Sequence, residues 1–373
     1  MTARTDAYGA PMTPQQLRDR IRPRAALSQQ AHSLQHRFFV VAGSEAPRVE
    51  VKAIPVRSKR SDGLTEFEVV VELAGVRVGE RAQHAPIQGK GFRRGLAPLK
   101  IPERERLLSP FIPAHLALSP APLRFAEARK TIFTELDDRV KRPTTIFAPD
   151  ERRIFQDTSY PWGTVGLVET PHGTGSGVMI GPRHVLTVSH VIDWNVQPPF
   201  AANWVKFTPS SFDGNEPFGH AFSTNIYWFN KDDGNNSINQ TEEQFDYVVV
   251  VLDSRIGELT GWMGARGYSD AWDGLNVWSH MGYPGDLNGG TRPSWQSPFT
   301  VDGSDSESDS HEAIMHKADV FPGQSGGPLF AWWDGDVGPR AVATQSWQNS
   351  STNGASGGAD LDELVVRARS DFP

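Results

Sequence analysis

Three short peptides in a fixed order constrain the fold of this chain more than any other feature of its sequence. They are Thr187-Val-Ser-His190, Phe245-Asp-Tyr247 and Gly323-Gln-Ser-Gly-Gly-Pro328. A serine hydroxyl is a weak nucleophile at neutral pH. It needs an imidazole to accept its proton and a carboxylate to hold that imidazole in the right tautomer. The sequence therefore predicts one site made of His190, Asp246 and Ser325, with Ser325 as the nucleophile.

The order of these residues distinguishes between the folds that carry such a site. Gly323–Gly327 also fits the Gly-x-Ser-x-Gly turn of α/β-hydrolases, in which the serine precedes both the acid and the histidine. The last of the 11 histidines is His316, so none follows Ser325 and this order is excluded. The order His, Asp, Ser is that of the chymotrypsin-like double β-barrel. A subtilisin-like order would need Asp157, and the sequence around Asp157 does not support it.

The distribution of β-like runs after residue 146 agrees with an all-β fold. Short runs recur between segments rich in Gly, Pro, Asp and Asn, which is typical of a barrel or sandwich. The runs are 164–169, 177–180, 184–188, 204–207, 247–252, 277–281 and 341–347. A helical pattern returns only at Asp360–Arg369. We therefore expect residues 146–373 to form an all-β domain, a chymotrypsin-like double β-barrel with a C-terminal helix.

Residues 1–145 have a mixed pattern and are expected to form a small α+β region. The expected elements are a helix over Thr13–His36, strands at 37–42, a hairpin of strands at 48–54 and 64–73, and a second helix over Phe125–Val140. Thr13 is a good N-cap, and Gln16 stands where a capping box needs it. Pro23 is expected to break or kink the first helix.

Charge is divided unevenly along the chain. Residues 1–150 contain 25 Lys and Arg against 16 Asp and Glu, whereas residues 151–373 contain 12 against 28. Three interpretations follow: a basic segment that docks on an acidic domain, a nucleic-acid-binding arm, or two differently charged solvated surfaces. The basic part has neither zinc-finger spacing nor an RNP-like aromatic motif, so nucleic acid is not expected as a partner.

Composition excludes several kinds of site. The chain has no cysteine, which excludes disulfides, thiolate metal sites and a cysteine nucleophile. No apolar run approaches the roughly 20 residues that a transmembrane helix needs, so no membrane partner is expected. Met1–Arg24 lacks the apolar stretch of a secretory signal. Asp302–Asp309 is expected to be a solvated acidic turn. A calcium site is the alternative, and it is disfavoured because the spacing of the acidic residues is not that of an EF-hand loop.

Local sequence explains how each member of the predicted site could be presented. His190 ends a strand-like run, and a rigid strand end can fix an imidazole as a base requires. Asp246 begins the most apolar run of the chain, where a carboxylate needs a hydrogen-bond donor such as an imidazole N–H. The other candidates for the acid are Asp232, Asp233 and Asp253. They are weaker, because the first two lie in a polar turn and the third lies at the far end of the strand.

Gly323 and Ser325 offer two backbone N–H groups beside the nucleophile. Gly323 lets the backbone turn so that both groups point to one spot, where they would stabilise the oxyanion of a tetrahedral intermediate. Losing one such donor typically costs roughly 3–4 kcal/mol in enzymes. The two glycines that follow leave room for a substrate and an imidazole. The alternative interpretation is an ordinary glycine-rich turn.

Five sequence blocks after residue 148 resemble the trypsin-like serine endopeptidases, in the branch of the glutamyl endopeptidases or V8-like proteases. The blocks are 150–162, 175–190, 246–257, 282–286 and 319–328. The resemblance implies two six-stranded barrels with the site between them and His190, Asp246 and Ser325 as the catalytic triad. It also implies secretion, peptide or protein substrates, and peptide hydrolysis that needs no metal or organic cofactor.

The resemblance leaves the specificity for the P1 residue open between basic, acidic and other side chains. Glutamate-selective members have a histidine in the strand beside the pocket, whereas Gln345 stands near that place here. Asp319 lies six residues before Ser325, the spacing at which trypsin carries the acid that selects Lys or Arg. Relatives of the glutamyl type also carry Asp there. Ser346 and Trp347 are expected to pair with the substrate backbone by strand addition.

The family is commonly made with a propeptide. Residues 1–145 are therefore expected to be a propeptide that inhibits the domain and is removed near Thr144–Ala148, as in a zymogen, or else a permanent adaptor. Gln324 replaces the aspartate that receives the new N-terminal ammonium in the trypsin branch, so that switch is not expected. The alternative to an enzyme is an inactive trypsin-fold binding protein, which the presence of all three triad residues disfavours.

Overall fold

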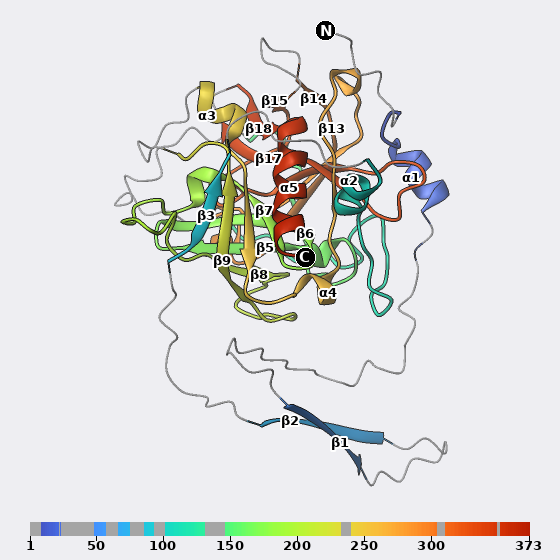
Figure 1. Cartoon of the computed structure of the whole chain (residues 1–373). Helices are drawn as coiled ribbons and strands as arrows, with labels where there is room; N and C mark the ends of the chain where they lie inside the picture. Colours follow the sequence, from blue (N-terminus) through green and yellow to red (C-terminus); the bar gives the residue numbers. More distant parts are fainter. Residues whose placement is uncertain are drawn as a thin grey trace. The chain divides into compact units, whose positions relative to one another are not determined.

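The computed structural model of the chain describes residues 9–21, 23, 48–56, 66–74, 86–92, 101–130, 146–232, 240–303, 310–348 and 351–373. Contacts divide the chain into two compact units, one made of residues 1–27 and 85–373 and the other of residues 28–84. In the smaller unit, strands β1 (Arg48–Val56) and β2 (Glu66–Ala74) form an antiparallel ladder (Figure 1). The predicted hairpin is thereby confirmed, whereas the run at 37–42 lies outside the described residues.

Six antiparallel strands of the larger unit close into a barrel. The strands are β5 (Val165–Thr170), β6 (Gly173–Gly181), β7 (His184–Thr187), β8 (Lys206–Pro209), β9 (Ala221–Trp228) and β10 (Val248–Leu252). They pair in the order β10-β7-β6-β5-β8-β9, and β9 also pairs with β10, which closes the ring. Every residue of β10 is buried, as its apolar sequence predicts.

A second, mainly antiparallel sheet is formed by strands that follow the barrel in the chain, together with β4, which precedes it. Its strands are β4 (Arg153–Ile154), β12 (Trp278–Gly282), β13 (Ser294–Phe299), β14 (Val301–Asp302), β15 (Glu312–His316), β16 (Pro328–Ala331), β17 (Arg340–Gln348) and β18 (Asn353–Gly357). The order is β14-β15-β18-β17-β16-β12-β13-β4, and the short β11 (Gly264–Ala265) pairs with β17. Within the described residues no pairing joins its two ends, so this sheet is a half-barrel.

The C-terminal helix α5 (Ala359–Asp371) confirms the helix predicted there and joins the two sheets. Figure 1 shows it in red, and it contacts β7, β9 and β10 of the barrel. Its residues Leu361, Leu364 and Val365 are buried in one core cluster with residues of both sheets. Their spacing gives the helix one continuous apolar face. A mostly β fold with a closed barrel, a half-barrel and a C-terminal helix confirms the predicted chymotrypsin-like class.

Four shorter helices accompany the sheets: α1 (Pro14–Arg20), α2 (Ile101–Leu108), α3 (Gln240–Phe245) and α4 (Gly257–Thr260). At α1, the Thr13 hydroxyl accepts the Gln16 N–H and the Gln16 side chain accepts the Thr13 N–H, so the predicted capping box is confirmed. The helix ends at Arg20, before Pro23, and residues 24–36 of the prediction lie outside the described residues.

Segments that precede residue 145 are built into the larger unit. Strand β3 (Gln88–Gly91) pairs in parallel with β9 on the outside of the barrel, and Ile87 beside it is 0% exposed. Helix α2 contacts α5, and its residues Leu107 and Leu108 belong to the core cluster of that helix. Cleavage of the chain at the boundary near residue 145 stays a prediction.

The second helix predicted in the N-terminal region is wrong where the structure describes it. Residues 125–130 are extended, and Phe125 forms an antiparallel bridge with Phe155. The Ala126 N–H donates to Ile154 O at 2.9 Å, and Gln156 N–H donates to Arg124 O at 3.0 Å. These long-range bonds satisfy the backbone groups that a helix would have satisfied locally, so tertiary pairing overrides a weak helical preference. Residues 131–140 lie outside the described residues.

Candidate active site

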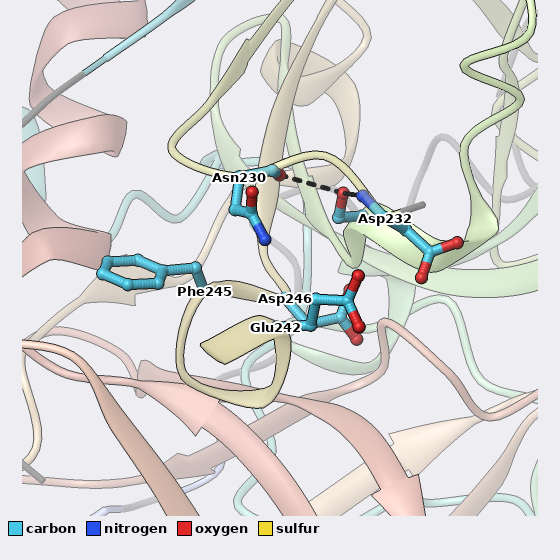
Figure 2. A pocket seen from close by; sticks show the side chains of 6 residues that line it. Asn230, Asp232, Glu242, Phe245 and Asp246 are labelled. Atoms are coloured by element: carbon cyan, nitrogen blue, oxygen red, sulfur yellow. Dashed lines mark hydrogen bonds between the residues drawn. The ribbon is translucent and has the colours of Figure 1, made fainter. Parts of the chain in front are cut away.

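The barrel places His190 at the end of strand β7. His190 lies in a single 3₁₀ turn, η4 (Ser189–Val191), that follows the strand. The Ser189 hydroxyl donates to Asn230 O at 3.1 Å and accepts the N–H of Asp232 at 3.0 Å. Figure 2 shows Asn230, Asp232 and Asp246 around one pocket, which Ser189 also lines, and its dashed lines mark hydrogen bonds between residues that line it. These two bonds attach the turn that carries His190 to the loop at 230–232.

Asp246 lies against that histidine. One carboxylate oxygen, Oδ2, is 2.6 Å from His190 Nδ1, and the other, Oδ1, accepts the backbone N–H of His190 at 3.0 Å. The Ser346 hydroxyl donates to Oδ2 at 2.5 Å. Asp246 is 3% exposed. Burial alone would raise the pKa of its carboxyl, but the adjacent imidazole and these hydrogen bonds hold that pKa below its usual value. The carboxylate stays ionised and orients the imidazole.

The loop that carries Ser325 is fixed between the barrel and the half-barrel. Ser325 O accepts the N–H of Ser176 on β6 at 2.7 Å. On the other side, the Gly326 N–H donates to Gln345 O of β17 at 2.8 Å. A Cβ on Gly326 would lie 2.2 Å from the Thr187 hydroxyl, at the end of the strand that leads into His190. The three peptides predicted to form one site thus converge, and Ser325 is half-buried.

The backbone at Gly323 has a conformation and a close contact that require glycine. Gly323 has φ of 101°, in the left-handed region, and a Cβ there would lie 2.4 Å from Tyr283 O. Its carbonyl accepts the Ser176 hydroxyl at 2.7 Å. Within the described part of the chain, neither the Gly323 N–H nor the Ser325 N–H donates to another protein group. Both are therefore available to a substrate oxygen.

Asp319 has partners that the sequence did not suggest. Its carboxylate oxygens accept the backbone N–H groups of Phe147, at 2.6 Å, and of Glu151, at 2.8 Å. The residue is 1% exposed, and its own N–H donates to Gln296 Oε1 at 2.6 Å. The carboxylate is therefore engaged in holding residues 147–151 against the half-barrel.

Gln345 is buried and oriented by a histidine. Its Oε1 accepts from His316 Nε2 at 2.7 Å, and its Nε2 donates to Trp347 O at 2.9 Å. Burial lowers the pKa of His316 to about 3, so the ring is neutral. Because His316 Nδ1 accepts the N–H of Ala318 at 3.3 Å, the ring proton is on Nε2 and the amide oxygen must face it.

Ser346 and Trp347 lie where strand β17 changes its pairing. The ladder with β18 has a bulge between Gln345 and Trp347, and this bulge turns the Ser346 side chain toward Asp246. The ladder with β16 ends at Thr344. On that side, residues 346–348 have no strand partner among the described residues, which leaves an edge that an extended peptide could join.

The sequence did not predict the contacts that two side chains, Ser346 and Arg152, make in the structure. Ser346 was expected to act through its backbone, yet its hydroxyl binds Asp246. Arg152 was included only as part of the block 150–162, yet its buried guanidinium binds the side chain of Gln324, the residue before Ser325. No local pattern distinguishes Arg152 from its neighbour Arg153, so only the folded chain separates them.

Membrane-spanning helices and clusters of metal ligands are the next features to consider. In the ranges that the structure describes, no helix has the length and apolar character to cross a membrane. Over the same ranges, no three His, Cys, Asp or Glu side chains gather as metal ligands would. Residues 304–309 of the acidic turn lie outside the described residues, so the calcium alternative for Asp302–Asp309 stays untested.

A closed six-stranded barrel together with a half-barrel is the architecture of the chymotrypsin-like fold. Residues 175–338 match the trypsin-like peptidase domain. The chain is 26% identical over 226 residues to the glutamyl endopeptidase of Bacillus licheniformis, which covers 59% of this chain. The match spans 64% of that relative, less than two thirds of its length.

Two solved structures are similar to this chain. The chain is similar to a Glu endopeptidase solved in complex with MPD, with a TM-score of 0.49 and 20% identity, covering 61% of this chain and 100% of that one. It is also similar to the protease Anisep from Arthrobacter nicotinovorans, with a TM-score of 0.45 and 18% identity, covering 59% and 99%. With the domain match and the relative above, the predicted resemblance to the trypsin-like serine peptidases is confirmed, and the chain is similar to a glutamyl endopeptidase of the V8-like branch.

Proposed function

We propose that this protein is a serine endopeptidase that hydrolyses peptide bonds through an acyl-enzyme formed on Ser325. His190 removes the hydroxyl proton of Ser325 as Ser325 attacks the peptide carbonyl. The N–H groups of Gly323 and Ser325 stabilise the oxyanion. His190 then protonates the leaving amine, and Asp246 stays ionised throughout. A water activated by His190 releases the acyl group in the second half of the reaction.

The observation that carries this proposal is the contact of a buried carboxylate with the imidazole. Asp246 holds both the ring and the backbone of His190, at 2.6 and 3.0 Å. A carboxylate is costly to bury unless hydrogen-bond donors face it. A bidentate grip fixes the ring tautomer with Nδ1 protonated, which leaves Nε2 as the base. The Gly323 and Ser325 amides complete the chemistry on the other side of the nucleophile.

A fluorophosphonate probe tests the proposal directly. We expect the full chain to be labelled covalently at Ser325 and to hydrolyse casein, and we expect Ser325→Ala to lose both. Ser297→Ala, which removes a hydroxyl bonded to Ser279 at 2.8 Å, serves as a matched control and should keep both activities. A wild-type protein that is folded but not labelled would favour the alternative function, an inactive trypsin-fold binding protein.

The contacts of Asp319 bear on the substrate. Its two oxygens each hold a backbone N–H of residues 147–151, so we infer that it supports this segment and does not select a basic P1 side chain. Acidic and other P1 residues remain candidates, with Gln345 near the pocket. Profiling on a peptide library should show no preference for Lys or Arg at P1, and Asp319→Asn should keep the same P1 ranking. Cleavage only after Lys or Arg would refute this inference.

For residues 1–145 we propose that the chain is cut near Thr144–Ala148 and that residues 86–130 stay bound after the cut. Ile87, Leu107 and Leu108 are buried in the cores of the larger unit, and a separated propeptide would expose them. Incubation of the purified chain should produce a new N-terminus on sequencing, and both fragments should elute together on gel filtration. An uncut chain that cleaves substrate would instead support the permanent adaptor.

A further inference from the structure

The strongest unexplained feature of the larger unit is the environment of Arg152. Its side chain is 0% exposed although it carries a charge. Nη2 lies 2.6 Å from Asp286 Oδ2 and Nη1 lies 2.9 Å from Asp286 Oδ1. Asp150 accepts from Nε at 3.0 Å and from Nη2 at 2.9 Å. Two carboxylates therefore bind the guanidinium in bidentate fashion, which is the strongest common geometry for this group.

The fifth N–H of the guanidinium does not go to a carboxylate. Nη1 also donates to Gln324 Oε1 at 3.1 Å. An arginine has five N–H donors, so the fork of Arg152 is fully used. The acceptor is the side chain of the residue that directly precedes Ser325. A buried cation is thus linked to the loop that carries the nucleophile.

The side chain of Gln324 is also hydrogen-bonded to the backbone of the loop. Its Oε1 also accepts the N–H of Phe321 at 3.0 Å, and its own N–H donates to Phe321 O at 3.1 Å. Both groups that face the side chain are donors, so the amide oxygen must point toward them. The side chain thereby closes the turn at 321–324 that contains Gly323, one of the two proposed oxyanion donors.

The segment that carries Arg152 is itself anchored. On one side of Arg152, Asp319 accepts the backbone N–H groups of Phe147 and Glu151. On the other side, Arg153 begins strand β4, which pairs with β13. Any cut near Thr144–Ala148 falls before Arg152, so the guanidinium stays in the same chain as Ser325. None of these contacts needs a free N-terminus.

We propose that Arg152 is a positioning residue that holds the oxyanion loop in its working form through Gln324, so that this loop is formed before any cleavage of the chain. The inference rests on the proposed peptidase function. A cut near Thr144–Ala148 would then leave the conformation of this loop unchanged.

The test compares two buried arginines in the full chain. Arg340 binds Asp336 in bidentate fashion at 2.7 and 2.7 Å and donates to Leu108 O, but it contacts no residue of the site. For Arg152→Ala we expect kcat to fall on the order of 100-fold with KM changed little, as for loss of one oxyanion donor. Guanidinium chloride at millimolar concentration should restore part of kcat. Arg340→Ala should keep kcat within about threefold, without rescue, even though it unfolds at a lower temperature.

A second variant and a second readout keep the test decisive. If Arg152→Ala does not fold, Gln324→Met removes the acceptor while both carboxylates keep Arg152, and it should lose kcat to a similar extent. Amide hydrogen exchange over 321–327 should be faster in Arg152→Ala than in Arg340→Ala. Unchanged kcat and unchanged exchange in a folded variant overturn the proposal. A wild-type chain that no fluorophosphonate labels refutes the peptidase function alone, and the exchange rates still decide the role of Arg152.

Discussion

At Asp246, three hydrogen bonds converge on a carboxylate that is 3% exposed. A buried carboxylate without such partners would take up a proton, because burial disfavours its charged form. The bond from Ser346 exists only because a bulge in β17 turns that side chain away from the regular pleat. The charge of the proposed orienting group therefore depends on a hydroxyl supplied by the other sheet.

Replacement of this hydroxyl gives the prediction for single residues. Ser346→Ala should lower kcat/KM by about 10- to 100-fold, since a hydrogen bond to a charged group contributes about 1.5–3 kcal/mol. Steady-state kinetics on a chromogenic peptide would measure it. Ser297→Ala, the control for a lost hydroxyl in the same half-barrel, should stay within about twofold. Equal kinetics of Ser346→Ala and the wild type would show that the bond is not needed.

Strand β3 shows how an element from the N-terminal region becomes part of the barrel. It covers the outer edge of β9, and Ile87 enters the barrel core with Val185 and Val250. The extended stretch at 125–130 behaves in the same way, since it pairs with residues 154–156 and not with itself. Both elements owe their conformation to partners far along the chain.

At this scale we predict a difference between two apolar substitutions in the same region. Ile87→Ala should lower the free energy of unfolding by about 2–4 kcal/mol, because it leaves a cavity in a packed core. Leu123→Ala, where the side chain is 61% exposed, should change it by less than about 0.5 kcal/mol. Urea unfolding of the full chain measures both. A small effect of Ile87→Ala would mean that residues 86–92 are not part of the barrel.

At the scale of the whole molecule, three of the buried histidines make stability depend on pH. Burial lowers the pKa of His184 to about 3, of His280 to about 4 and of His316 to about 3. In the unfolded chain each ring takes up a proton near pH 6.5. Between about pH 6.5 and pH 4 the unfolded state thus binds more protons, and stability falls as pH falls. Burial of Asp362 raises its pKa to about 6 and opposes this with one proton.

The corresponding prediction is acid-sensitive stability. Each histidine should contribute up to about 1.4 kcal/mol per pH unit to the slope of unfolding free energy between pH 6 and 4. Urea unfolding at pH 7, 6 and 5 would measure the slope, and His316→Gln should reduce it by about one proton. A flat profile in the wild type would contradict the prediction.

Several features could be predicted because each depends on residues that are close together in the sequence. The glycines around Ser325, the apolar run after Asp246 and the alternation of short β-runs with turn residues each depend on neighbours within a few positions. The class of fold and the three peptides of the site follow from these signals and from their order. The capping box at Thr13 and the β1–β2 hairpin were predicted for the same reason.

The sequence by itself thus determined which residues bring an imidazole, a carboxylate and a hydroxyl, and in what order. Only the tertiary structure decided what each of them touches. The partners of Asp319 lie 172 and 168 positions away, and the acceptor of Arg152 at Gln324 lies 172 positions away. The physical reason is burial: whether a charge is solvated or must find a partner is set by packing between distant segments, and no local pattern records it.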